Sequence, residues 1–115
     1  MRLLGFLTLL ALAAGGCFPP GGNLLGKEFG AAPVVAVRDA RAARAPVTLR
    51  GTMTEKCPVA ACWFRLKDRT GVMKVDLKAA GFTVTNVPEG AEVTVSGTVD
   101  RSGDLPTLVA TGLRW

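Results

Sequence analysis

Strict alternation of apolar and polar residues, beginning at Val47, is the feature that most restricts the fold of this chain. Apolar residues or glycine occupy the odd positions from 47 to 53, while threonine or arginine occupies the even positions. Alternation of this kind is typical of strands with one buried face and one solvated face. The pattern recurs four more times, so we expect five strands, at 47–54, 62–67, 72–77, 92–101 and 107–113.

The connections between these strands are marked by turn residues. Residues 68–71, Asp-Arg-Thr-Gly, predict a hairpin turn between the second and third strands. The longer connection 78–91 opens with Lys-Ala-Ala-Gly, for which we expect a single helical turn, and a second helical turn is expected at 38–44, before Pro46. Five short strands with a helical turn after the third predict an all-β protein with little helix, a five-stranded OB-fold Greek-key barrel. Gly51 and Gly97 lie inside strands, where a barrel needs sharp bends.

The N-terminal 16 residues predict a signal peptide. Arg2 is followed by an apolar run to Ala14, which is too short for a transmembrane helix of about 20 residues. Cleavage is possible after the A-x-A sequence at 11–13, or before Cys17, since Ala-Gly-Gly-Cys at 14–17 resembles a bacterial lipobox. Acylation of Cys17 also fits the cysteine count, because it leaves Cys57 and Cys62 as a pair.

The domain organisation follows from these segments. We expect a signal peptide at 1–16, a lipid-attached flexible tether rich in Pro and Gly at 17–26, and one OB-fold domain at 27–115 whose N-terminal extension lies against the barrel. The predicted location is the cell envelope, on an exported and membrane-anchored lipoprotein. The net charge of +5, or +4 once Arg2 is removed, is mildly basic.

Three stretches resemble a known family. They are VTLRG from Val47, the sequence W-F-R-L-K-D-R-T-G from Trp63, and EVTVSGTVD from Glu92, and together they resemble the bacterial OB-fold (BOF) family. They are also similar to the OB-fold nucleic-acid-binding domains of synthetases and helicases. The Cys-x4-Cys-Trp loop is similar to that of a group of exported bacterial domains. These resemblances imply the fold and an envelope location, and they leave the ligand open.

Cys57 and Cys62 are the first candidate site. In an oxidising compartment they predict a disulfide that closes the loop between the first two strands. The alternatives are a redox or copper site, since two thiolates suit Cu(I), or a pair of free thiols. Met53 and Met73 could add thioether ligands, but their alternation places them in the core. Zinc is disfavoured because the chain has no histidine and a closed zinc site needs four ligands.

The outward faces of the first three strands are the second candidate site. In OB-folds this surface, flanked by the loops after strands one and four, is the usual ligand site. The residues predicted to form it are Trp63, Arg65, Lys67, Lys74 and Arg50. An aromatic side chain among cations is typical of sites for single-stranded nucleic acid, but export favours an anionic envelope ligand or a protein partner and makes nucleic acid the third choice. The alternative is a solvated basic face.

Enzymatic motifs are missing from the sequence. It has no histidine for a Ser-His-Asp arrangement, no phosphate-binding glycine loop and no dinucleotide fingerprint. Its carboxylates fall in predicted turns or at outward positions. We therefore expect a non-enzymatic binding or accessory module with no cofactor, copper at the two cysteines being the alternative.

Overall fold

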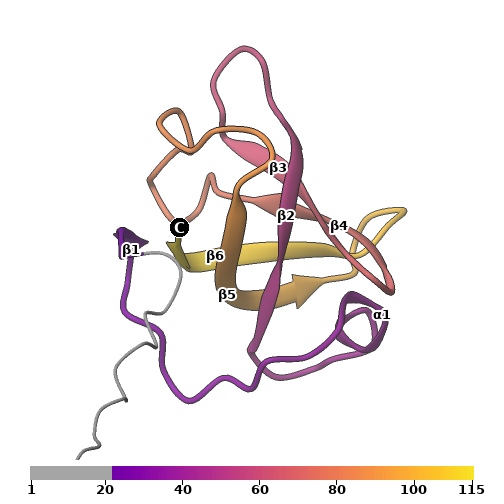
Figure 1. The fold of residues 1–115 in the computed structure, drawn as a ribbon. Coiled ribbons are helices and arrows are strands. Elements are labelled where there is room, and N and C mark those ends of the chain that lie inside the picture. The colour runs from indigo at the N-terminus through magenta and orange to yellow at the C-terminus, as the bar shows by residue number, and fades with distance from the viewer. Residues whose placement is uncertain (1–21) are drawn as a thin grey trace, which may run out of the picture.

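The computed structural model describes residues 22–115, so the predicted signal peptide and Cys17 lie outside the described residues. One short helix and six strands make up this part of the chain (Figure 1). They are β1 (Leu24–Gly26), α1 (Val37–Ala40), β2 (Val47–Lys56), β3 (Trp63–Asp68), β4 (Gly71–Asp76), β5 (Glu92–Asp100) and β6 (Thr107–Arg114). No helix within residues 22–115 has the length and apolar character needed to cross a membrane.

The five strands β2 to β6 close into a barrel, as the alternation predicted. The sheet order is β1-β6-β4-β3-β2-β5, and an additional pairing of β5 with β6 closes it. The β4–β6 pairing is parallel and the other pairings are antiparallel. A closed five-stranded barrel with this connectivity is an OB-fold, so the predicted fold class is confirmed.

β2 is shared between two halves of the barrel. Its residues 47–52 pair with β5 and its residues 52–56 pair with β3, with a register shift between Met53 and Glu55. Gly51 lies at the crossover, where a Cβ atom would come within 2.4 Å of the Lys67 carbonyl oxygen. The absence of a side chain at Gly51 therefore lets β3 approach β2 closely.

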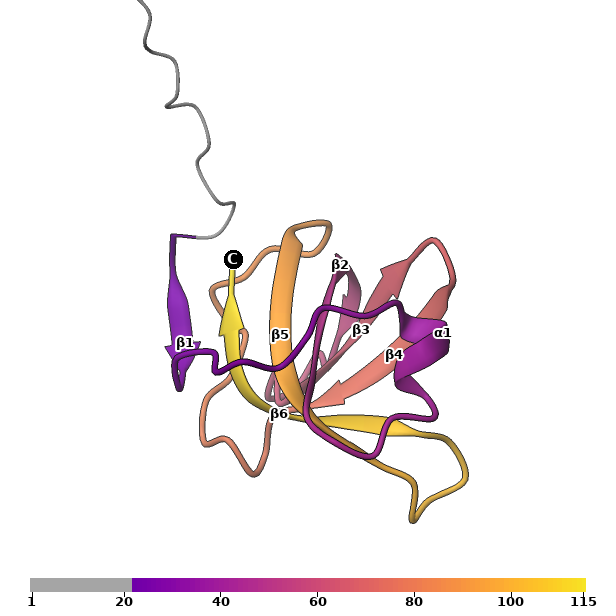
Figure 2. The same ribbon diagram turned by 90° about the horizontal axis from the view of Figure 1, so that it is seen from below.

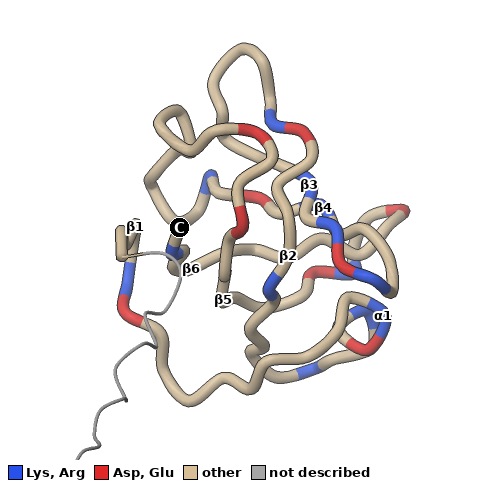
Figure 3. The backbone as a smooth tube through the Cα atoms, in the orientation of Figure 1, with Lys and Arg blue, Asp and Glu red and all other residues tan. Residues whose placement is uncertain are grey.

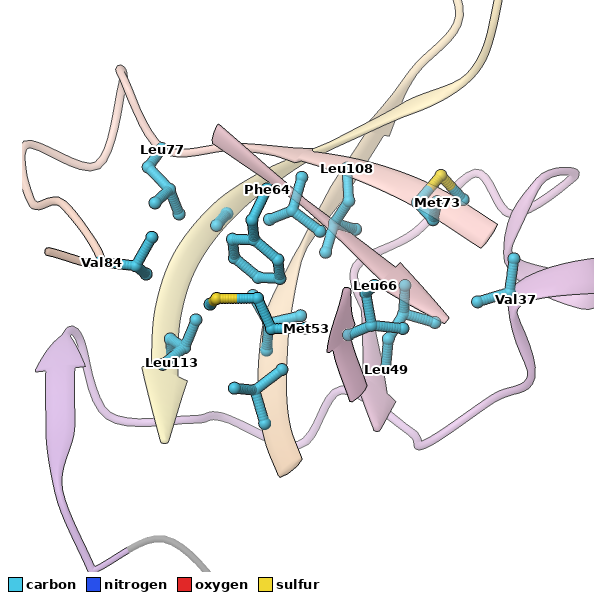
Figure 4. Packing of buried hydrophobic residues seen from close by; sticks show 14 of the residues in the cluster. Val37, Leu49, Met53, Phe64, Leu66, Met73, Leu77, Val84, Leu108 and Leu113 are labelled. Carbon is cyan, nitrogen blue, oxygen red and sulfur yellow. The ribbon is translucent and has the colours of Figure 1, made fainter. Parts of the chain in front are cut away.

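The barrel interior is filled by the apolar residues at the alternating positions (Figure 4). Phe64 is the largest fully buried side chain, and Met53 lies beside it in the same cluster. Met73 is also buried, so both methionines belong to the core, as their alternation predicted. The connection 78–91 contributes Val84 and Val87 to the same core, and both side chains are fully buried.

Residues 27–36 run along the barrel as an extended segment (Figure 2). Val35 donates its N–H to the Thr48 carbonyl at 2.9 Å, and Thr48 donates its N–H to the Pro33 carbonyl at 2.8 Å. This contact buries Thr48 and Ser96, whose hydroxyls lie 2.6 Å apart. The alternation had placed both side chains outward in solvent, which is wrong because the extension covers that part of β2 and β5.

The predicted tether also needs correction at its C-terminal end. Residues 24–26, placed in the tether, form β1 and pair with residues 112–114 of β6. Asn23 and Trp115 extend this pairing by exchanging backbone hydrogen bonds of 3.1 Å. Three residues are too few to show an alternation, so the sequence could not reveal a strand whose partner is the last strand of the chain.

The two predicted helical turns differ in outcome. The first is α1, which is shorter than the predicted range 38–44. The second, at 78–81, is one hydrogen-bonded turn in which Gly81 donates its N–H to the Leu77 carbonyl at 3.2 Å, with Gly81 in the left-handed region. It ends there because the left-handed residue stops helix propagation.

Candidate ligand-binding face

Trp63, Arg65 and Lys74 form a compact group on the outer face of β3 and β4. The register places Arg65 directly opposite Lys74, with Trp63 two residues earlier on β3. The guanidinium of Arg65 lies 5.4 Å from the Trp63 ring centroid, and the ammonium of Lys74 lies 5.2 Å from it. We call these three residues the tryptophan platform. The π-face of Trp63 attracts both cations and so holds two like charges close together.

Glu55 completes the electrostatics of the tryptophan platform. Its carboxylate accepts a hydrogen bond of 2.9 Å from Arg65 Nε, and both side chains are largely exposed. An exposed ion pair of this kind contributes about 0.2–1 kcal/mol, so it positions the Arg65 side chain more than it stabilises the fold. Because Glu55 pairs with Arg65, the Lys74 ammonium, 5.2 Å from the ring centroid, gives the platform its net positive charge.

A cleft of about 550 Å³ adjoins the tryptophan platform. It is lined by Arg41, Arg65, Val72, Lys74, Gly103, Asp104, Leu105, Pro106 and Thr107. We call it the cationic cleft, because three of its side chains are basic and one is acidic. Leu105 is 74% exposed, so the cleft offers an apolar wall beside its cations.

The segment that follows α1 is held against this cleft by two arginines. Arg41 Nη2 donates to the Val72 carbonyl on β4 at 3.1 Å. Arg101, at the start of the β5–β6 connection, donates to the carbonyls of Arg41 and Ala43. These bonds hold Arg41, at the end of α1, on the same side of the barrel as residues 103–106. The two segments form opposing parts of the cleft lining.

Lys67 and Arg50 do not line the cationic cleft, so the five predicted residues do not all belong to one site. Lys67 lies opposite Val72 on β4 and Thr52 on β2, and it lines a separate cleft with Arg69. Arg50 lies on the half of β2 that pairs with β5, opposite Thr94. Figure 3 shows the lysines and arginines of β3, β4 and α1 as blue segments of the backbone.

Asp68 fixes the hairpin that carries the tryptophan platform. Its Oδ1 accepts hydrogen bonds from the Thr70 N–H and hydroxyl, both 2.7 Å, and from the Gly71 N–H at 3.1 Å. Its Oδ2 accepts the Val37 N–H at 2.8 Å, which ties α1 to the hairpin. Burial raises the pKa of Asp68, but the donors from Val37 and Thr70 together outweigh it and hold this pKa below its usual value.

Replacement of Asp68 by Asn should therefore make the protein less stable at neutral pH. We expect a loss of about 1–3 kcal/mol in the free energy of unfolding, because charge-assisted hydrogen bonds are weakened. The pKa of Asp68 is lowered on folding, so its contribution is complete above the unfolded value of about 4 and is lost as the pH falls through the folded value. Urea unfolding at several pH values measures this difference. Exposed Asp104→Asn is the control, and a difference between wild type and Asp68→Asn that persists unchanged to pH 2 would contradict the prediction.

Cys57 and Cys62 lie on the loop between β2 and β3, both half-buried and both as thiols. Backbone N–H groups, those of Ala60 first and Val59 next, hold the pKa of the Cys57 thiol below its usual value, and the thiol of Cys62 adds to this effect. The predicted disulfide stays a prediction. The part of the chain that the structure describes brings together no three His, Cys, Asp or Glu side chains suited to a metal ion.

Two contributors to the cationic cleft were not among the residues predicted from the sequence. Arg41 reaches the cleft only because the extension folds back on the barrel, and no pattern in the sequence indicates that contact. The loop after the fourth predicted strand was expected to flank the ligand site, but none of its residues was named. The structure shows that Leu105 and Pro106 of this loop line the cationic cleft. The Leu105-Pro106 pair that follows the turn residues Ser102 to Asp104 was the available signal in the sequence.

Comparison with known proteins agrees with this architecture. Residues 18–109 match the family described as "Bacterial OB fold (BOF) protein". Among solved structures, that of the hypothetical protein ygiW from E. coli is similar, with 23% sequence identity and a TM-score of 0.56, over 76% of this chain and 98% of that chain. At this identity the likeness concerns the fold. No curated protein sequence matches the chain.

Proposed function

The chain belongs to the bacterial OB fold (BOF) family, and on this premise we propose that it is a non-enzymatic binding module of the cell envelope. Its ligand is an anionic envelope component, bound at the tryptophan platform and the cationic cleft. The protein is exported and attached to a membrane through acylated Cys17.

The observation that carries the proposal is the position of two cations against one aromatic ring beside an open cleft. Arg65 and Lys74 both contact the Trp63 ring and both line the cationic cleft, where Arg41 adds a third positive charge. Three converging donors with an adjacent apolar wall suit a phosphorylated or carboxylated polymer that also offers a sugar or lipid face.

The location of the site in the fold supports the same proposal. The outer face of the second and third barrel strands, next to the connection between the fourth and fifth, is where OB-folds bind oligonucleotides and oligosaccharides. In this chain those strands are β3 and β4, and the connection is residues 101–106. An exported protein meets envelope polyanions before it meets nucleic acid.

Removal of the two platform cations should weaken binding to envelope polyanions. We expect Arg65→Ala with Lys74→Ala to reduce the affinity for purified lipopolysaccharide and for teichoic acid by about 10-fold or more, because each lost charge contact is worth on the order of 1 kcal/mol. Fluorescence of Trp63, in a Trp115→Phe background, reports the binding directly. The affinity should also fall as salt is raised.

Arg50→Ala is the matched control, because it removes an exposed arginine from β2 on the part of the barrel that pairs with β5. An equal loss with Arg50→Ala would mean that net charge alone is responsible and would rule out this site. Dextran sulfate is a second control, because it is a polyanion unrelated to the envelope. Equal affinity for dextran sulfate and for the envelope polymers would mean that the protein recognises charge alone.

Anchoring is tested separately, by metabolic labelling with palmitate. We expect the wild-type chain to be labelled and the Cys17→Ser chain to lose the label and to be released from the membrane fraction. Equal labelling of both chains would contradict lipidation at Cys17.

A further inference from the structure

The cationic cleft holds a large share of the exposed apolar surface of the protein. Within residues 22–115, the exposed large apolar side chains are Val34, Val59, Val72 and Leu105. Two of these four, Val72 and Leu105, line the cationic cleft beside Pro106. Such side chains gain free energy when an apolar group covers them, and a wholly hydrophilic ligand has no such group. The cleft therefore offers a place to an apolar part of the ligand.

Strand pairing fixes these apolar side chains close to a cation. Val72 and Lys74 are two residues apart on β4, and both are exposed on its outer face. Lys74 pairs with Thr107, the first residue of β6. The Thr107 hydroxyl donates to the Leu105 carbonyl at 3.4 Å. The loop that carries Leu105 therefore ends directly beside Lys74, so an ammonium group and two apolar side chains share one cleft.

The charges of the cleft restrict the kind of anion that fits it. The ion pairs among residues 22–115 involve neither Lys74 nor Arg41, so both charges are available to a ligand. Asp104 also lines the cleft and is next to Leu105 in the loop. Its carboxylate repels a second anionic group at the loop wall. This distribution suits a head group with a single phosphate, held on the side of the cleft where Lys74 lies.

We propose that the cationic cleft binds an anionic phospholipid with one phosphate. The inference rests on the proposed function and names the class of its anionic ligand. The phosphate contacts Lys74, Arg65 and Arg41, and the first part of an acyl chain packs against Leu105 and Val72. The cleft volume of about 550 Å³ lies within the range of small-molecule sites, roughly 300–1,000 Å³, so it accommodates the head group and the start of a chain.

The test uses the full chain with Cys17→Ser, so that no lipid anchor of its own competes for the cleft. Binding of dihexanoyl phosphatidylglycerol, kept below the concentration at which it forms micelles, is measured by NMR titration. Glycerophosphoglycerol supplies the same head group without chains, and dihexanoyl phosphatidylcholine supplies the same chains without net charge. We expect the phosphatidylglycerol to bind at least about 10-fold more tightly than either, because only this ligand uses both the cations and the apolar wall. The amide signals of Val72 and Thr107 should shift.

Two variants separate the apolar wall from the cations. Leu105→Ser should weaken the binding of dihexanoyl phosphatidylglycerol by about 10-fold and leave that of glycerophosphoglycerol unchanged, because only the lipid covers the leucine. Lys74→Ala should weaken the binding of both ligands by about 5-fold or more, because both lose a charge-assisted contact. Val59→Ser is the matched control, since Val59 is 92% exposed and lies outside the cleft lining. The affinities of this control should equal those of the parent chain.

The outcomes distinguish this proposal from the proposed function. Equal affinity for phosphatidylglycerol and glycerophosphoglycerol, or equal effects of Leu105→Ser and Val59→Ser, would overturn the lipid proposal and leave an anion site in the cleft. Equal affinity for phosphatidylcholine would overturn it too, because the cations would then select nothing. Absence of binding by phosphatidylglycerol would also overturn it, and binding of the envelope polymers would then decide separately on the proposed function. The NMR spectrum shows whether each variant is folded, and Leu105→Ala replaces a serine variant that is not.

Discussion

Phe64→Ala should lower the free energy of unfolding by about 3–5 kcal/mol, the range found when a fully buried aromatic side chain is truncated. Phe64 has no exposed surface and lies at the centre of the barrel core, next to Met53 (Figure 4). Its removal leaves a cavity that the five closed strands cannot collapse to fill. Urea unfolding followed by circular dichroism measures the loss.

Phe64→Leu provides the graded control, because it keeps an apolar side chain of similar reach in the same position. We expect it to cost less than half as much as Phe64→Ala. Val59→Ala, at an exposed position of the β2–β3 loop, should leave stability unchanged. A cost below about 1 kcal/mol for Phe64→Ala would mean that this side chain does not fill the barrel interior.

Gly97→Ala should be the second severe substitution, with a loss of about 3 kcal/mol. A Cβ atom at Gly97 would come within 2.2 Å of the Val109 carbonyl oxygen and 2.9 Å of the Ala110 Cα. Both neighbours are backbone atoms of β6, so no side-chain rotation can relieve the overlap. Relief would require β5 and β6 to separate at the register shift between Ser96 and Gly97.

Gly103→Ala is the matched control for Gly97→Ala, because nothing lies within 4 Å of a Cβ atom built there. It should leave the free energy of unfolding unchanged or slightly raise it, since alanine restricts the unfolded chain. Equal effects of the two substitutions would show that glycine is needed for backbone freedom rather than for close approach of the strands. Thermal unfolding monitored at two wavelengths distinguishes the outcomes.

The barrel strands were predictable because each buries one face and exposes the other. Their ends differ from the prediction by one or two residues, as at β2, which extends to Lys56 rather than 54. Thr48 and Ser96 broke the rule, because the segment around Pro33 covers them and supplies backbone partners to Thr48, whose hydroxyl in turn pairs with that of Ser96. A contact between an irregular segment and a strand leaves no periodic pattern in the sequence, so it could not be predicted.

The tryptophan platform was predictable for a similar reason. Trp63 and Arg65 alternate with core residues on one strand, and Lys74 follows across a recognisable hairpin, so all three had to emerge on one face. Arg50 also points outward, yet it pairs across to β5 rather than β3. In a closed barrel, outward directions diverge from strand to strand, so a shared outward orientation does not imply proximity.

The sequence by itself determined the number and order of the barrel strands, the glycines at their crossings and the pairing of Trp63 with its basic neighbours. These features depend on the alternation within each strand and on turns of a few residues. Both patterns can be read from short stretches of the sequence. The tertiary structure alone decided the pairing of β1 with β6, the burial of Thr48 and the reach of Arg41 into the cationic cleft. Each of these depends on contacts between segments distant in the chain, whose free energy exists only once the barrel has closed.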